Sequence, residues 1–355
     1  MSIVRNTLLF ATLVLVAVVL GSCSKQVAPK GPTGPSGVLQ VFNWQDYIPE
    51  DVITDFKKEY PNIKLVYDTF GSNEDMYQKI LNGADYDVVF PSTDFVPRML
   101  AGDLLAEIDP AKVPELVNVV PFINEKNTWD SGNKHSVPYN LGATAVVYWK
   151  DQVSVSEAEK SWNFLANPKY AKKGMAMDDE REILGGALKY NGYSVNSQNP
   201  AEISKAKDTV KTWKKTLIKF DNDLIKKAFA TREIQIAFNY PENIAAELDP
   251  ADIPKLGFFF PKEGGMMYLD VMTIMKKAKN VDNAYLFINY ILRPEIQARI
   301  DDAYGYPGIY PKSVALRKNK PWYTVDLLKD HEIRGSVGDA IGLYDKAWAE
   351  IRSGQ

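Results

Sequence analysis

Residues 38–60 of this 355-residue chain read VLQVFNWQDYIPEDVITDFKKEY, and the expected architecture follows from them. The mostly apolar residues 38–42, with two valines and a phenylalanine, predict a strand. Pro49 then opens a helix whose apolar residues recur one turn apart, and Pro61 ends it. The chain thus passes from a strand through a short loop into an amphipathic helix, which is the first half of a strand–helix–strand unit.

Downstream segments continue this alternation of strands and helices. The predicted strands cover residues 63–70, 87–90, 174–177, 234–238 and 256–261, and the predicted helices cover residues 72–83, 179–190, 201–220, 284–292 and 337–351. Such alternation indicates that each lobe holds a mixed, mostly parallel sheet flanked by helices. Two long apolar segments, 141–149 and 267–275, are suited to crossing between two lobes.

We therefore predict an α/β chain made of two discontinuous lobes. The first lobe comprises residues 38–142 and 267–315, and the second comprises residues 143–266 and 316–355. The two crossing segments would form a hinge between them. Because ligands of open α/β sheets bind at the carboxyl ends of the strands, the expected site is the cleft between the lobes.

The N-terminal segment is expected to serve targeting. Arg5 precedes an almost uninterrupted apolar run. This run is short for a membrane-spanning helix and is typical of a signal peptide, which would cover residues 1–22. The sequence LGSC at residues 20–23 resembles a bacterial lipobox, which predicts lipidation of Cys23; the alternative is an incidental cysteine. Residues 23–37 are rich in Pro, Gly, Lys and Ser and are typical of a flexible tether.

Composition excludes several classes of function. The chain has 42 Lys and Arg against 45 Asp and Glu, and this near balance argues against a nucleic-acid binder. His135 and His331 are the only histidines and Cys23 is the only cysteine, so a His/Cys metal site is excluded in practice and no cofactor is expected. The sequence also contains neither a G-x-x-x-x-G-K-[ST] motif nor a G-x-S-x-G nucleophile elbow.

The loop after the first strand is the first candidate binding segment. Asp46 lies between Trp44 and Tyr47, where the strand gives way to the helix. A carboxylate binds an ammonium group, and aromatic faces attract organic cations and cover methylene chains. The alternative is a loop with buried aromatics and a solvated Asp46, and the composition of this stretch alone favours that alternative.

Acidic residues recur at the starts of two predicted helices. Ser92 and Asp94 follow a strand and precede a helix, so Asp94 caps that helix, contacts a ligand, or does both. Asp179 and Glu182 are three residues apart at a helix start, so they share one helical face. The helix dipole favours their ionised forms, and helix stability alone would explain such residues equally well.

A glycine pair at residues 264–265 leads to the third acidic position. Tyr268 and Asp270 alternate onto one face of the following predicted strand. A buried Asp270 needs a partner, which either a cationic ligand or a structural Lys or Arg would provide. Tyr240 follows a predicted strand and Tyr306 lies in a turn, and each aromatic taken singly is more often part of a core than of a ligand wall.

Together these motifs resemble those of the bacterial periplasmic spermidine/putrescine-binding proteins of the PotD type. The resemblance covers the chain from about Val38 to the C-terminus. Its markers, in family order, are Asn43-Trp44-x-Asp46-Tyr47-x-Pro49, Tyr86-Asp87-Val88-Val89-x-Pro91-Ser92, Asp178-Asp179-x-x-Glu182, Gly264-Gly265 to Asp270, and Gly305-Tyr306-Pro307.

The resemblance implies a two-lobed periplasmic-binding-protein fold of type II and a set of ligand contacts. The ligand-binding residues predicted in this way are Trp44, Asp46, Tyr47, Ser92, Asp94, Asp179, Glu182, Tyr240, Tyr268, Asp270 and Tyr306. Asp270 would be the central carboxylate. Tyr240 and Tyr268 stand where the family often has Trp, and Asp94 stands where an aromatic is common, so the balance between putrescine and spermidine stays open. Arg334 falls near a C-terminal contact of the family and is not assigned.

The implied function is capture of putrescine or spermidine outside the cytoplasm and delivery to the permease of an ABC transporter. The protein would be a monomer anchored to the membrane through Cys23, and not an enzyme. One alternative is a binding protein for another small solute; an amino acid would normally need an Arg, and no Arg falls among the predicted lining residues. A second alternative is a hydrolase with a carboxylate pair, Asp179 with Glu182 or Asp270 with Asp46.

Overall fold

A computed structural model describes residues 34–45 and 47–353 of the chain. The predicted signal peptide, Cys23, most of the predicted tether and Asp46 lie outside these residues. Residues from Pro35 onward form one compact unit. In the part of the chain that the structure describes, no helix is both long enough and apolar enough to cross a membrane.

The larger sheet contains six strands. They are β1 (Gly37–Trp44), β2 (Ile63–Phe70), β3 (Val88–Val89), β4 (Val137–Ala143), β9 (Met266–Ile274) and β10 (Glu332–Ile333). The order is β10-β9-β3-β1-β2, and β4 also pairs with β9. Pairing is parallel for β1 with β2, β1 with β3 and β10 with β9, whereas β9 runs antiparallel to β3 and β4.

The smaller sheet contains four strands in the order β6-β7-β5-β8. They are β5 (Ala145–Trp149), β6 (Gly174–Ala176), β7 (Ile236–Asn239) and β8 (Leu256–Phe259). In this sheet β6 pairs in parallel with β7, whereas β5 pairs antiparallel with both β7 and β8. The sheet is therefore mixed, and the prediction that parallel pairing dominates in both lobes is wrong for this one.

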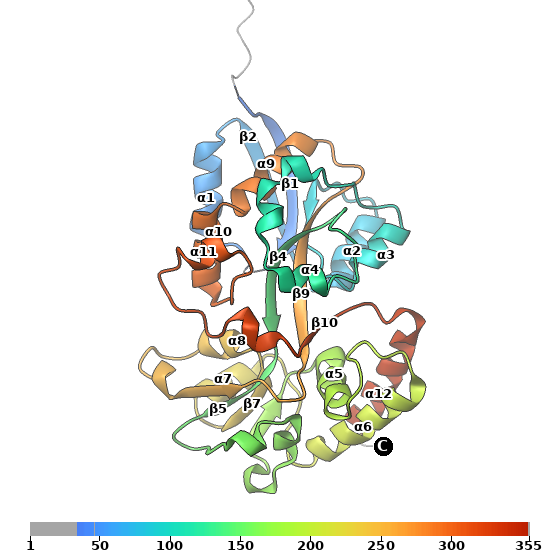
Figure 1. Cartoon of the computed structure of the whole chain (residues 1–355), viewed down its shortest axis with the longest axis vertical. Coiled ribbons are helices and arrows are strands. Elements are labelled where there is room, and N and C mark those ends of the chain that lie inside the picture. The colour runs from blue at the N-terminus through green and yellow to red at the C-terminus, as the bar shows by residue number, and fades with distance from the viewer. Residues whose placement is uncertain (1–33, 46, 354–355) are drawn as a thin grey trace, which may run out of the picture. The chain divides into compact units, whose positions relative to one another are not determined.

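Helices flank both sheets. They are α1 (Glu50–Glu59), α2 (Asn73–Leu81), α3 (Val96–Ala101), α4 (Pro121–Glu125), α5 (Glu180–Tyr190), α6 (Pro200–Lys214), α7 (Leu224–Ala230), α8 (Pro241–Ala245), α9 (Val281–Ile291), α10 (Pro294–Tyr304), α11 (Pro311–Val314) and α12 (Ile341–Ser353). In Figure 1, α1 and α10 lie on one side of the larger sheet and α2 and α3 on the other, while α5, α6 and α12 pack together beside the smaller sheet. The fold is thus α/β with two mixed sheets.

Two crossings connect the sheets, as the apolar segments predicted. The chain leaves β4 of the larger sheet at Ala143 and enters β5 of the smaller sheet at Ala145, with only Thr144 between them. It returns through β9, and Figure 1 shows β4 and β9 running side by side toward the smaller sheet. Thr144 is completely buried, so this crossing is part of the packed interior.

The hydrophobic core is also divided between the larger and the smaller sheet. One cluster of buried residues draws on 39–143 and 267–333, and the others draw on 145–259 and 337–351. Tyr323 belongs to the first cluster, although the predicted boundaries place it in the second lobe. The lobe boundaries themselves stay a prediction.

Candidate functional site

A cavity of about 310 Å³ lies where residues of the larger sheet meet residues of α5, α8 and the segment after β10. Its lining residues are Trp44, Tyr47, Gly71, Ser72, Asn73, Glu74, Ser92, Asp179, Tyr240, Asn243, Tyr268, Asp270, Tyr306 and Arg334. Most of the predicted ligand-binding residues are among them. The exceptions are Glu182 and Asp94, which lie behind the wall, and Asp46, which lies outside the described residues.

The backbone places Ser92 opposite Asp270. The antiparallel register that pairs Val89 with Thr273 continues past the end of β3, so Ser92 and Asp270 form an isolated bridge. The amide of Thr93 donates to the carbonyl of Leu269 at 2.9 Å and holds this extension in place. A strand end and the middle of the crossing strand β9 thereby meet at the cavity.

Asp270 is the buried acidic centre of the cavity. Its side chain accepts hydrogen bonds from the Ser92 hydroxyl at 2.5 Å and from the Tyr47 hydroxyl at 2.8 Å. The residue is only 1% exposed, and this burial raises the pKa of its carboxyl to about 7. Among the described residues no Lys or Arg forms an ion pair with Asp270, so two neutral hydroxyls are its partners.

Aromatic rings surround this carboxylate. Tyr47 lies 5.9 Å from Trp44 and 6.0 Å from Tyr306 between ring centroids, and Tyr240 and Tyr268 meet edge to face at 5.3 Å. Burial, and for Tyr47 also the neighbouring Asp270, raises the pKa of these tyrosines well above the ordinary value, so they stay neutral. The cavity therefore combines π faces with a buried carboxylate.

Tyr268 reaches the cavity because Gly142 faces it. Gly142 of β4 pairs with Tyr268 of β9, and a Cβ atom at Gly142 would lie 2.6 Å from the Tyr268 ring and 2.8 Å from the Glu242 carboxylate. Real Cβ contacts are not that short, so any larger residue would displace the ring. Tyr268 and Asp270 share one face of β9, as the alternation predicted.

Glu182 lies behind the wall rather than on it. It is 1% exposed, and its carboxylate accepts hydrogen bonds from the Thr144 hydroxyl at 2.9 Å and the Tyr240 hydroxyl at 3.0 Å. Burial and the nearby charge of Asp179 raise the pKa of Glu182. Tyr240 lines the cavity and Glu182 does not, so the Tyr240 side chain, whose hydroxyl donates to Glu182, lies between Glu182 and the cavity. A direct contact between Glu182 and a ligand stays a prediction.

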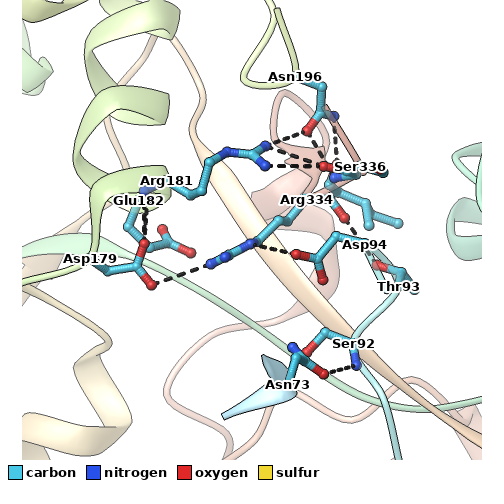
Figure 2. Close-up of polar contacts among 12 residues, drawn as sticks. Asn73, Ser92, Thr93, Asp94, Asp179, Arg181, Glu182, Asn196, Arg334 and Ser336 are labelled. Atoms are coloured by element: carbon cyan, nitrogen blue, oxygen red, sulfur yellow. Dashed lines mark hydrogen bonds and ion pairs between the residues drawn. The ribbon is translucent and has the colours of Figure 1, made fainter. Parts of the chain in front are cut away.

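Asp94 and Asp179 are both bound to Arg334. Its Nε donates to Asp94 at 3.1 Å and its Nη1 donates to Asp179 at 3.3 Å, as Figure 2 shows. Asp179 also caps α5 by accepting from the amides of Arg181 and Glu182. Burial pulls the pKa of Asp179 upward, but the Arg334 guanidinium and the backbone amides of Glu182 and Arg181 together outweigh it and leave that pKa below its ordinary value.

Asp94 does not cap the helix that follows it. The residue before α3 is Phe95, which has no side-chain cap, and the Asp94 carboxylate turns to Arg334 instead. A carboxylate that is only 7% exposed needs a counter-charge, and the guanidinium supplies it. The capping alternative is therefore wrong.

Arg334 is the lining residue that sequence reasoning left unassigned. It comes from the segment after β10, 240 residues from Asp94 and 155 residues from Asp179. The predicted lining residues include no Arg, whereas Arg334 does line the cavity. The sequence carries no local signal for this contact, because it depends on how β10 pairs with β9. Asn73, Glu74 and Asn243 were likewise not predicted.

Comparison with known proteins places this chain in a family. The model of the family described as bacterial extracellular solute-binding protein matches residues 51–328. The chain therefore belongs to this family of solute-binding proteins, which act outside the cytoplasm. Its fold is the two-domain fold of periplasmic binding proteins, as the solved structures below show.

Individual relatives are similar over nearly their whole length. The spermidine/putrescine-binding periplasmic protein of Salmonella typhimurium is 31% identical, over 89% of this chain and 92% of the relative. The putrescine-binding periplasmic protein PotF of Escherichia coli is also 31% identical, with the same coverage. The solved structure of the TpPotD lipoprotein of Treponema pallidum superposes with a TM-score of 0.84 at 35% identity, covering 89% of this chain and 99% of that one.

Proposed function

We propose that this protein captures linear polyamines in the cavity around Asp270 and delivers them to the permease of an ABC transporter. The observation that carries this proposal is that Asp270 is buried and accepts hydrogen bonds only from the neutral hydroxyls of Ser92 and Tyr47. A buried carboxylate held only by neutral hydroxyls is unfavourable as an anion, and a bound ammonium group would offset that cost. The aromatic rings would cover the methylene chain and add cation–π attraction.

The relatives support the same substrate class. Relatives at about 30% identity over most of this chain are binding proteins named for spermidine, putrescine or both. The substrate-binding protein PotD of Streptococcus pneumoniae, which belongs to a spermidine/putrescine ABC transporter, is 29% identical and superposes with a TM-score of 0.79. These names and the chemistry of the cavity thus point to the same class of ligand.

The proposal includes the role and location of the protein. It acts as a binding protein without catalysis, tethered to the membrane through a lipid on Cys23 and monomeric. The LGSC sequence at residues 20–23 supports the anchor. The site residues assigned to the ligand are those predicted from the sequence, with Asp270 central, with Glu182 acting through Tyr240, and with Asp94 and Asp179 acting through Arg334.

An amino-acid solute is the second candidate, because Arg334 lines the cavity. An amino acid would need a guanidinium free to pair with its carboxylate. Arg334 already donates to Asp94 and Asp179, so polyamine binding is the better supported candidate.

A thermal-shift panel on protein refolded to remove bound ligand separates the two candidates. A ligand at one hundred times its dissociation constant stabilises by about 2.7 kcal/mol, which raises the melting temperature measurably. Putrescine or spermidine should produce this shift, and glutamate and γ-aminobutyrate should not. A shift with the amino acids alone contradicts the proposal.

A further inference from the structure

Arg334 stands between two cavities. It lines both the 310 Å³ cavity around Asp270 and a second cavity of about 980 Å³, and of the residues lining the two only Glu74 also belongs to both. The second cavity lies beyond the ion pairs with Asp94 and Asp179 and carries the acidic residues Glu180 and Asp345 on its wall. The guanidinium therefore forms one end of the cavity that holds Asp270.

Several contacts fix Arg334 in this position. Its amide donates to the carbonyl of Met267 at 2.9 Å, and its own carbonyl accepts from the Thr93 hydroxyl at 3.1 Å. The next residue along the chain is held as well, because Arg181 donates from both terminal nitrogens to the carbonyl of Gly335 at 3.3 Å. These hydrogen bonds hold Arg334 and the residue after it in place, so Arg334 is not a surface side chain that lies near the cavity by chance.

The ion pairs decide which carboxylates remain for a ligand. Asp94 and Asp179 share the single positive charge of Arg334, so both carboxylates are already in ion pairs. Of the carboxylates that line the first cavity, Asp270 and Glu74 are the ones without an ion pair among the described residues. Two unpaired carboxylates match a ligand with two ammonium groups. A third ammonium near Arg334 would meet the like charge of the guanidinium and would have to compete with it for the Asp94 and Asp179 carboxylates.

We propose that Arg334, which is held by Asp94 and Asp179, closes one end of the cavity and occupies the place that a further ammonium group of the ligand would otherwise take. The cavity therefore selects diamines over triamines. This inference rests on the proposed function and deepens it. A triamine would have to displace the guanidinium and break two ion pairs before its third ammonium could reach the same carboxylates. A diamine leaves them intact.

The test is a calorimetric titration of refolded wild-type protein, Arg334→Gln and Arg98→Gln with putrescine and with spermidine. Arg98 is the matched control, because it lines the second cavity and stacks on the Tyr77 ring at 4.5 Å but pairs with neither aspartate. The wild type should bind putrescine roughly tenfold or more tightly than spermidine. Arg334→Gln should shift the ratio of the two dissociation constants toward spermidine by about tenfold or more, and Arg98→Gln should leave it unchanged.

A double variant keeps the inference testable if Arg334→Gln fails to fold. Removing the guanidinium leaves Asp94 buried without a counter-charge, so Arg334→Gln combined with Asp94→Asn removes both charges at once. This double variant should shift the ratio in the same direction. An unchanged ratio in both variants, with putrescine binding retained, overturns the inference alone. Absence of binding of either amine to the wild type overturns the proposed function and this inference with it.

Discussion

The hydroxyl of Ser92 and the carboxylate of Asp270 meet at 2.5 Å across an antiparallel bridge that extends the pairing of β3 with β9. The ladder of the larger sheet therefore sets the position of the central carboxylate. Because β9 also crosses toward the smaller sheet, movement of one sheet against the other would change the walls around Asp270 while leaving its hydroxyl partners in place.

Replacing Asp270 with Asn should weaken putrescine binding. The substitution keeps the shape of the side chain but removes its charge, and a hydrogen bond to a charged group contributes about 1.5–3 kcal/mol. The dissociation constant should rise roughly tenfold to one-hundredfold. Calorimetry gives the value, and Asp87→Asn is the control, because Asp87 is similarly buried but accepts only from backbone and side-chain groups of the protein outside the cavity. An unchanged affinity in Asp270→Asn would favour another solute or another site.

Removing the Tyr47 hydroxyl should raise the pKa of Asp270 further. That hydroxyl donates to the carboxylate at 2.8 Å and favours the ionised form. In Tyr47→Phe the aromatic face remains, so a loss of affinity of about 1 kcal/mol would measure the hydrogen bond rather than the stacking. Tyr67→Phe serves as the control, since the Tyr67 hydroxyl accepts from Asn43 and does not line the cavity. Equal affinities for Tyr47→Phe and wild type would show that the bond is unimportant for binding.

Binding should strengthen as the pH rises toward 7. The pKa of Asp270 in the ligand-free protein is raised to about 7 by burial, and an ammonium ligand requires the ionised form. Affinity for putrescine should therefore increase about tenfold between pH 6 and pH 8 and change little above that range. Titrations in two buffers with different ionisation enthalpies should show release of a proton on binding near pH 6. Affinity that is independent of pH across this range would mean that Asp270 is already ionised.

The stability of the ligand-free protein should follow the opposite trend. The folded-state pKa of Asp270 lies above its unfolded value, so the unfolded state loses its proton first and the folded state is progressively destabilised between about pH 4 and pH 7. Glu242, whose pKa burial raises to about 8, acts in the same direction. Denaturant titrations at pH 5 and pH 7.5 measure the difference, which should shrink in Asp270→Asn. A difference of the same size in that variant would assign it to other groups.

Substituting Gly142 with Ala should disturb the cavity through Tyr268. The new methyl group would meet the Tyr268 ring and the Glu242 carboxylate, and such overpacking costs about 1–3 kcal/mol. We expect a lower melting temperature together with weaker putrescine binding. Adding Tyr268→Ala to Gly142→Ala should recover much of the stability but not the affinity. A destabilisation that persists in the double variant would place the clash elsewhere.

Local patterns predicted the elements that carry the site. The strand at residues 63–70 was predicted residue for residue, since the segment is bounded by Pro61 on one side and by Gly71 and Ser72 on the other. The position of Asp179 at a helix start was also predicted, and it caps α5. Such features depend on neighbours within a few residues, so the sequence carries them directly.

Long-range contacts set the limits of the prediction. The helix expected to reach residue 220 ends at Lys214, because Ile218 and Phe220 pair with β6 instead. Tertiary pairing there overrides helix propensity. Arg334 is the same kind of case, since its two aspartate partners come from distant parts of the chain. The acidic residues could be identified from the sequence, but the ion pairs of Asp94 and Asp179 with Arg334 could not.

Calorimetric titration of refolded protein with putrescine tests the central claim most directly. The account predicts a single site with a dissociation constant in the micromolar range or below, because two or three charged hydrogen bonds contribute about 1.5–3 kcal/mol each. The same titration of Asp270→Asn should show much weaker binding. The absence of heat with putrescine and with spermidine, on folded wild-type protein free of ligand, would contradict the account.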